Sequence, residues 1–169
     1  MTLNPTLRPH EVLAVAVRAE IEAADFYGRL QEKVKNILLR QKLDFLVTEE
    51  KKHRQILERL HGQRFPGVAL KIPESPERPK TAAAWDGKSS ILDLFKLALE
   101  AERLAEQYYK DARGVMADAG SKKMLEYLSR VERSHYFLIK SEIDLLGRFP
   151  DYYDAEDFHL GEDLFHVGP

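Results

Sequence analysis

The sequence predicts an all-α protein, a four-helix bundle built from two antiparallel helix hairpins. Three observations predict this fold. Four long stretches place apolar residues every three or four positions, and none alternates apolar and polar residues as a half-buried strand does. A long proline-rich segment separates the second stretch from the third, whereas the other two connections are short. The two halves of the chain also match each other at a single offset.

The first two helices are expected at about residues 9–34 and 36–61. Pro9 suits the first turn of a helix, where its missing N–H leaves no hydrogen bond unmade. The side chain of Asn36 can cap the second helix, and Gly62 is expected to end it. Because only a short connection joins them, these helices should form an antiparallel hairpin.

The third and fourth helices are expected at about residues 90–116 and 121–146. Ser90 can cap the third helix, and Asp93 lies in its first turn, where the helix dipole favours a negative charge. The fourth helix is expected to end at Gly147. These two helices form the second predicted hairpin.

The connection between the hairpins, residues 62–89, is too rich in helix breakers to be helical. It holds four of the eight prolines and three glycines, so we expect a long crossover loop. Together these elements make residues 1–147 one four-helix domain. Residues 148–169 form an acidic and aromatic tail that is too apolar for a purely solvated segment. We expect this tail to pack on the bundle or on a partner subunit.

Composition and charge exclude several kinds of site. The 169 residues include 26 Lys and Arg against 28 Asp and Glu, and a net charge of −2 predicts no nucleic-acid partner. The chain has no cysteine, which excludes disulfides, thiolate metal sites and cysteine nucleophiles. It shows no secretory signal, and no apolar run approaches the roughly 20 residues that span a bilayer. We therefore expect a cytoplasmic protein without membrane contact, in which any metal is bound by His and carboxylates.

The two hairpins are related by an internal repeat. A shift of 82 residues lays the first helix on the third and the second on the fourth without a gap. The aligned pairs are Glu20 with Glu102, Tyr27 with Tyr109, Glu50 with Glu132, and His53 with His135. Since one offset serves both helices, the pattern indicates a duplicated helix pair.

Six polar residues interrupt the apolar stripes that should face the core: Glu20, Glu50, His53, Glu102, Glu132 and His135. In the second and fourth helices a Glu and a His stand three positions apart, so both side chains can reach one metal ion. Four converging carboxylates are unfavourable in a core without positive charge, and no Lys or Arg shares these stripes. Two divalent cations would balance the four negative charges. Four Glu and two His placed in this way are the ligand set of di-iron and di-manganese carboxylate bundles.

For individual residues, alternatives stay open. A single Glu or His on an apolar face can be a hydrogen-bonded core residue, and the whole cluster could be a metal-free polar core. Tyr27 and Tyr109 are interpreted as core residues or as hydrogen-bond donors behind the ligands, rather than as redox groups. Glu106 is interpreted as an exposed flanking acid, with an additional ligand as the alternative. Glu22 and Glu49 are interpreted as solvated neighbours of the site.

The chain resembles the rubrerythrin-like branch of the ferritin-like superfamily over about residues 9–147, apart from the crossover. Four motifs carry the resemblance: Ala19-Glu20-x6-Tyr27, Glu50-x-x-His53, Glu102-x6-Tyr109 and Glu132-x-x-His135. The resemblance implies a ferritin-like four-helix bundle with a non-haem di-iron site, in which some carboxylates bridge the two ions. The ligands it implies are Glu20, Glu50, His53, Glu102, Glu132 and His135.

The same resemblance implies an oxidoreductase whose two iron ions per chain react with dioxygen or hydrogen peroxide, in a family that often forms homodimers. Rubrerythrins carry a four-cysteine iron site that supplies electrons, so this cysteine-free chain would need an external electron-donor protein. They also tend to have a further Glu one turn along the third helix, where this chain has Ala105. Manganese and zinc suit the same ligands, and a metal-storage or metal-sensing bundle without turnover is the alternative function.

Overall fold

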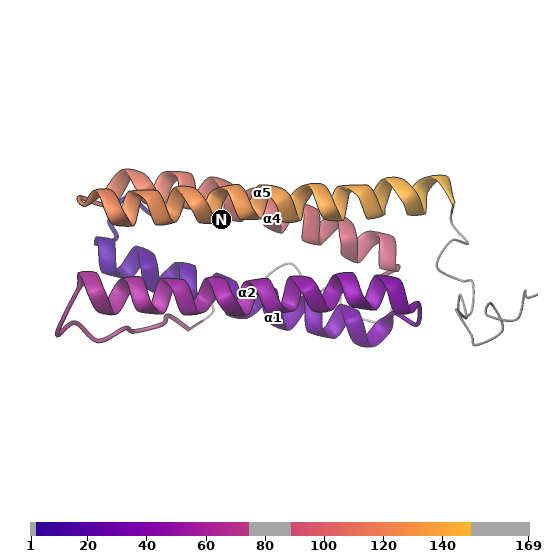
Figure 1. Cartoon of the computed structure of the whole chain (residues 1–169), viewed down its shortest axis with the longest axis horizontal. Coiled ribbons are helices and arrows are strands. Elements are labelled where there is room, and N and C mark those ends of the chain that lie inside the picture. Colours follow the sequence, from indigo (N-terminus) through magenta and orange to yellow (C-terminus); the bar gives the residue numbers. More distant parts are fainter. Residues whose placement is uncertain (1–2, 75–88, 150–169) are drawn as a thin grey trace, which may run out of the picture.

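The structure, a computed structural model, describes residues 3–74 and 89–149. Within these residues all regular structure is helical and lies in four helices: α1 (Pro9–Lys33), α2 (Ile37–Arg64), α4 (Ile91–Val115) and α5 (Ala119–Arg148). α1 and α2 form one antiparallel hairpin, and α4 and α5 form the other (Figure 1). The predicted all-α four-helix bundle is confirmed.

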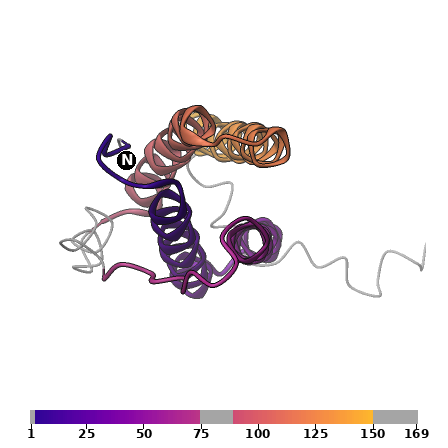
Figure 2. The same cartoon turned by 90° about the vertical axis from the view of Figure 1, so that its left-hand side faces the viewer.

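The two hairpins pack side by side with α1 against α4 (Figure 2). Most of the contact between helices lies within each hairpin, and α2 touches α5 less than α1 touches α4. The space at the middle of the bundle is therefore bounded by all four helices, and two different hairpins contribute to it.

Side-chain caps fix where three of the helices begin. Asn36 Oδ1 accepts hydrogen bonds from the backbone N–H groups at the start of α2, and Ser90 caps α4, both as expected. The Asp93 side chain also accepts a hydrogen bond from the Ser90 N–H, which completes a reciprocal cap. Asp118 caps α5 by accepting a hydrogen bond from the Ser121 N–H, with 2.9 Å between Oδ1 and N. This cap explains why α5 begins at Ala119 rather than at the expected residue 121.

Two glycines that were expected to end helices lie inside them. α2 continues through Gly62 to Arg64, so the crossover begins at residue 65 rather than 62, and α5 continues through Gly147 to Arg148. A glycine costs a helix about 1 kcal/mol relative to alanine. In α2 that cost is offset by its last turn, where His61 is buried and its ring packs against Phe65.

Apolar side chains fill the bundle on both sides of its middle. One cluster, which includes Leu13, Leu57 and Leu128, occupies one end of the bundle. A second cluster, which includes Leu43 and Phe95, occupies the other end. Because burial of apolar surface is the main stabilising term in folding, these two clusters hold the four helices together and close the middle of the bundle from both ends.

Two parts of the sequence-based interpretation fall outside the described residues. The middle of the crossover, residues 75–88, is one of them, and the tail from residue 150 onward is the other. The expected packing of this tail on the bundle or on a partner therefore stays a prediction. Among the described residues, no helix combines the length and the apolar character that crossing a bilayer requires.

Candidate metal centre

All six predicted site residues meet at the middle of the bundle. α1 and α4 each supply one Glu, and α2 and α5 each supply a Glu and a His. All six residues are at most 3% exposed: Glu20, Glu50, His53, Glu102, Glu132 and His135. Four carboxylates and two imidazoles thus share one buried site, as the apolar stripes predicted.

The six residues form two overlapping groups, in each of which the candidate ligand atoms lie within 4.8 Å of one another. One group is Glu20, Glu50, His53 and Glu132, and the other is Glu50, Glu102, Glu132 and His135. Glu50 and Glu132 belong to both. The arrangement provides for two adjacent cations, with one carboxylate and one imidazole at each and two carboxylates shared between them.

Both histidines face the carboxylates through Nδ1. His53 Nδ1 lies 2.9 Å from Glu132 Oε1 and 3.2 Å from Glu50 Oε2. His135 Nδ1 lies 3.2 Å from Glu50 Oε1 and 3.7 Å from Glu132 Oε2. The two rings stack with their centroids 5.5 Å apart and their planes 17° from parallel. Nδ1 is therefore the nitrogen that each ring presents to the shared carboxylates.

Many polar atoms of this cluster have no hydrogen-bond partner. In the described residues nine buried side-chain nitrogen or oxygen atoms lack one, and eight of them belong to the six site residues. A buried polar group without a partner costs about 1–3 kcal/mol. Carboxylate oxygens and imidazole nitrogens are also the atoms that bind iron, manganese and zinc. The donor set and its unmet bonding capacity therefore fit two bound divalent cations.

Two tyrosines hold the carboxylates that are not shared. The Tyr27 hydroxyl on α1 donates to Glu102 Oε1 on α4, and the Tyr109 hydroxyl on α4 donates to Glu20 Oε1 on α1. The other oxygen of each carboxylate lacks a hydrogen-bond partner. Glu20 Oε2 lies 3.4 Å from Nδ1 of His53, the residue that shares its ligand group. Each tyrosine thus joins the two hairpins and leaves one carboxylate oxygen directed into the cluster.

Burial and charge shift the pKa values of these groups strongly. The pKa values of Glu20 and Glu102 lie well above the ordinary range. Burial is the largest cause, and the charge of the neighbouring carboxylates is the next. Burial would lower the pKa of His135, but the neighbouring carboxylates, Glu102 first, outweigh it and raise this pKa to about 12. The pKa of His53 rises for the same reason, and the two histidines lower that of Glu50 against the effect of burial. Without a metal, protons supply the positive charge that the carboxylates need.

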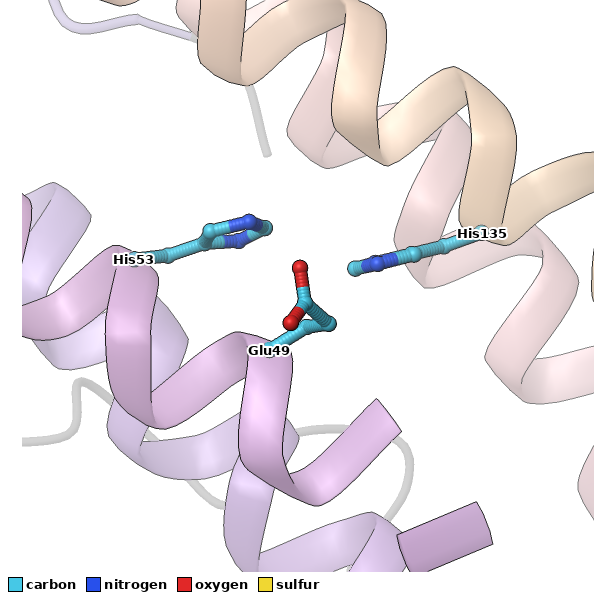
Figure 3. Close-up of side chains that lie close together, drawn as sticks. All are labelled: Glu49, His53 and His135. Carbon is cyan, nitrogen blue, oxygen red and sulfur yellow. The ribbon is translucent and has the colours of Figure 1, made fainter. Parts of the chain in front are cut away.

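Glu49 lies closer to the site than its expected role as a solvated neighbour implied. Its side chain is 18% exposed and forms an ion pair with Lys52, with 2.7 Å between Oε1 and Nζ. Glu49, His53 and His135 also form a third group whose ligand atoms lie within 4.8 Å of one another. Figure 3 shows the Glu49 carboxylate pointing into the gap between the two imidazole rings. The sequence signal for this contact was the i, i+4 spacing of Glu49 and His53, which puts both on one helix face.

The remaining acids near the site have partners on their own helices. Glu106 is less exposed than expected, with a side chain that is 15% exposed and forms an ion pair with Lys110. It belongs to none of the candidate metal-binding groups among the described residues. Glu22 pairs with Arg18, with 2.8 Å between Oε1 and Nε. Both residues therefore flank the six-residue cluster.

A bundle of two helix hairpins with a repeated Glu-x-x-His pair facing a buried carboxylate cluster defines the ferritin-like class of dinuclear metal proteins. The comparisons agree with this class. The sequence profile of the family described as Rubrerythrin matches residues 11–143. The chain belongs to the Rubrerythrin family.

Two solved structures resemble the fold. Hypothetical protein Pfu-1136390-001 from Pyrococcus furiosus is 32% identical, with a TM-score of 0.72 over 84% of this chain and 92% of that chain. KatB, a manganese catalase from Anabaena PCC7120, is 19% identical, with a TM-score of 0.66 over 90% of this chain and 80% of that chain. The second likeness shows the fold alone. A search of curated proteins found no significant match.

Proposed function

We propose that this protein is a dinuclear iron oxidoreductase that reacts with dioxygen or hydrogen peroxide and receives its electrons from an external donor protein. The observation that carries the proposal is the concentration of six unpartnered buried atoms, four carboxylate oxygens and the two histidine Nδ1 atoms, in two overlapping ligand groups. Family membership supports it, because the matched profile spans all six of these residues.

Each residue of the cluster has a distinct part in holding the ions. Glu20 and His53 would bind one ion, Glu102 and His135 would bind the other, and Glu50 and Glu132 would bridge them. Iron at these positions would supply the one-electron steps that the reduction of dioxygen or peroxide requires. We prefer iron or manganese to zinc for this role because zinc has no redox chemistry.

The chain's own residues fix the geometry of the site and close it at both ends of the bundle. Tyr27 and Tyr109 orient the two carboxylates that are not shared. A histidine that binds a cation through Nδ1 carries its proton on Nε2, and metal-binding histidines usually donate this proton to a carboxylate. The Glu49 carboxylate points between the two rings, and we infer that it would accept this proton when the cations are bound. The apolar clusters close the site to water at the two ends of the bundle.

The proposal extends to the setting of the protein. The chain has no cysteine with which to bind an electron-transferring iron site, so the reducing electrons would come from another protein. The family resemblance supports a homodimer, and we propose a cytoplasmic location.

Reaction of the reduced protein with its oxidant tests the proposed function. The chain is loaded anaerobically with Fe²⁺, mixed with dioxygen or hydrogen peroxide, and followed by stopped-flow absorption. We expect about two irons per chain and a ligand-to-iron absorption band that grows on mixing and bleaches on reduction. The control variant Glu106→Gln should behave like the wild type. If zinc fills the site and Fe²⁺ cannot displace it, or if bound Fe²⁺ does not react with either oxidant, the chain is a binding or storage protein.

A further inference from the structure

A pocket of about 260 Å³ lies against the carboxylate cluster between α1 and α4. Glu20, Glu50, Glu102 and Glu132 are among its lining residues, and neither histidine of the cluster is. All its other lining residues belong to α1 and α4, so the pocket reaches the carboxylates from the side away from Glu49. Ala101, on its wall, is exposed, so the pocket communicates with the surface.

Small apolar side chains create this space. Ala19 and Ala23 on α1, and Ala101 and Ala105 on α4, line it. Under the internal repeat, Ala19 corresponds to Ala101 and Ala23 to Ala105, so both halves of the chain place alanine at the same two positions. A leucine at any of these positions would occupy part of the pocket. The space therefore follows from the small side chains of both repeats.

The pocket is larger than dioxygen or hydrogen peroxide requires. A cavity of about 150 Å³ accepts a benzene molecule, whereas one water occupies about 30 Å³ of the liquid. A volume of about 260 Å³ thus accommodates an organic molecule of benzene size or somewhat larger.

The polar groups of the lining define which molecule fits. The hydroxyls of Tyr27 and Tyr109 donate to the cluster carboxylates, and the Tyr108 hydroxyl donates to the Val12 carbonyl. No tyrosine hydroxyl of the lining therefore has a proton left to donate to a ligand. A ligand body next to Ala23 and Ala105 must therefore be apolar. The other charged group of the lining, Glu22, is already paired with Arg18. The place left for a single polar end is therefore the carboxylate cluster and its cations.

We propose that this pocket binds a small organic molecule with an apolar body and a single oxygen atom, the size class of phenol, with the oxygen directed toward the cations. The inference rests on the proposed function for the direction of the oxygen atom. Binding of the apolar body does not rest on the proposed function, because it depends on the pocket alone.

Binding of benzene and phenol to the full-length protein tests the two parts separately. Benzene binding is measured by ligand-observed NMR on metal-free and on Zn²⁺-loaded protein, and we expect saturable binding to both. The Ala105→Leu variant should weaken it at least tenfold, and Ala23→Leu should do the same from the opposite wall. Ala119→Leu, which adds the same volume at the exposed start of α5, should leave it unchanged. Unaltered helicity and metal content in each variant show that the fold is intact.

The position of the oxygen atom is tested with Co²⁺, whose visible absorption spectrum changes with its ligands. We expect phenol, but not benzene, to change the spectrum of the Co²⁺-loaded protein, and Ala105→Leu to suppress the change. Absence of saturable benzene binding, or equal binding by Ala105→Leu, would overturn the inference whatever the state of the metal site. Failure of the chain to bind metal, with benzene binding intact, would instead refute the proposed function and the orientation of the ligand.

Discussion

In Glu20 and Glu102, the two carboxylates that are not shared, one oxygen accepts a hydrogen bond from a tyrosine and the other is free to bind a cation. In Glu20, Oε1 accepts a hydrogen bond from Tyr109, and Oε2 faces Nδ1 of His53 at 3.4 Å. Glu102 is held in the same way by Tyr27. A carboxylate fixed through one oxygen loses less freedom when the other binds a cation, so these tyrosines prepare the site before the metal arrives.

The variant Tyr109→Phe tests this role. Loss of the hydroxyl leaves Glu20 Oε1 buried without a donor, which should lower the free energy of unfolding by about 1–3 kcal/mol. It should also weaken metal binding roughly 10–100-fold. Chemical denaturation and Zn²⁺ titration measure the two effects. Tyr108→Phe is the matched control, since it removes a buried hydroxyl that donates to the Val12 carbonyl at 2.8 Å. The control should lose stability and retain metal affinity; equal metal affinity in both variants would contradict the role of Tyr109.

The variant Glu49→Gln tests whether this carboxylate accepts the Nε2 protons of the two imidazoles when metal is bound. Since an acceptor for Nε2–H orients a metal-binding histidine and raises its basicity, the variant should bind Zn²⁺ roughly 10–100-fold more weakly. In ¹H–¹⁵N spectra of the Zn²⁺-loaded protein, the Nε2–H resonances of His53 and His135 should move upfield. Glu106→Gln removes a similarly half-buried, lysine-paired acid and should change neither property. Unchanged imidazole resonances in Glu49→Gln would show that Glu49 is only a neighbour of the site.

At the scale of the helices, the sequence predicted the elements better than their ends. Apolar periodicity and the caps at Asn36 and Ser90 are local signals, and both caps form as expected. Gly62 was misjudged because a glycine can either stop a helix or lie inside it. The choice depends on the packing of the last turn, where the His61 ring meets Phe65 and His10 of α1. That packing involves residues far apart in sequence, so a local sequence pattern does not predict it.

Replacement of two glycines by alanine separates the two interpretations of the end of α2. Gly62 lies within the helix, and a Cβ added there meets nothing within 4 Å, so Gly62→Ala should stabilise the protein by about 0.5–1 kcal/mol. Gly67 has a φ of 83°, so Gly67→Ala should destabilise it. Thermal and chemical denaturation measure both. Destabilisation by Gly62→Ala would place the end of the helix at residue 62 after all.

At the scale of the whole molecule, the bundle is two repeated hairpins that meet around a shared charge cluster. The six residues were predictable because helical periodicity places each on a core-facing stripe, and the repeat showed that both halves do so. The sequence did not predict the hydrogen bonds between the hairpins, the position of Glu49 or the pocket beside Ala105. They depend on how the two hairpins pack, which a spacing pattern does not specify.

The charge cluster makes the stability of the metal-free protein depend on pH. The pKa of His135 is about 12 in the folded protein and about 6.5 in an unfolded chain. Its contribution to stability is therefore fully present below about pH 6.5 and is lost as the pH rises toward 12. The raised pKa values of His53, Glu20 and Glu102 act in the same direction. The lowered pKa of Glu50 removes stability as the pH falls below its ordinary value near 4.5.

The dependence of the melting temperature on pH should therefore differ between the chelated and the Zn²⁺-loaded protein. The chelated protein should be most stable near pH 4.5. It should lose stability as the pH rises from there, first through Glu20 and Glu102 and above about pH 6.5 through the histidines as well. The Zn²⁺-loaded protein should instead gain stability as the pH rises toward 6.5, because its histidines hold cations rather than protons whereas the histidines of the unfolded chain are protonated below this pH. Parallel pH profiles of the chelated and loaded forms would show that metal and protons do not share this site.

The central claim is that Glu50 and Glu132 are shared by two cations in this bundle. An anomalous-difference map from crystals of the natively purified protein, with data collected on both sides of the iron edge, tests it most directly. Our account predicts two adjacent iron peaks, one beside Glu20 and His53 and the other beside Glu102 and His135, with Glu50 and Glu132 between them. A map with no peak among these residues, or with a single ion, would contradict it.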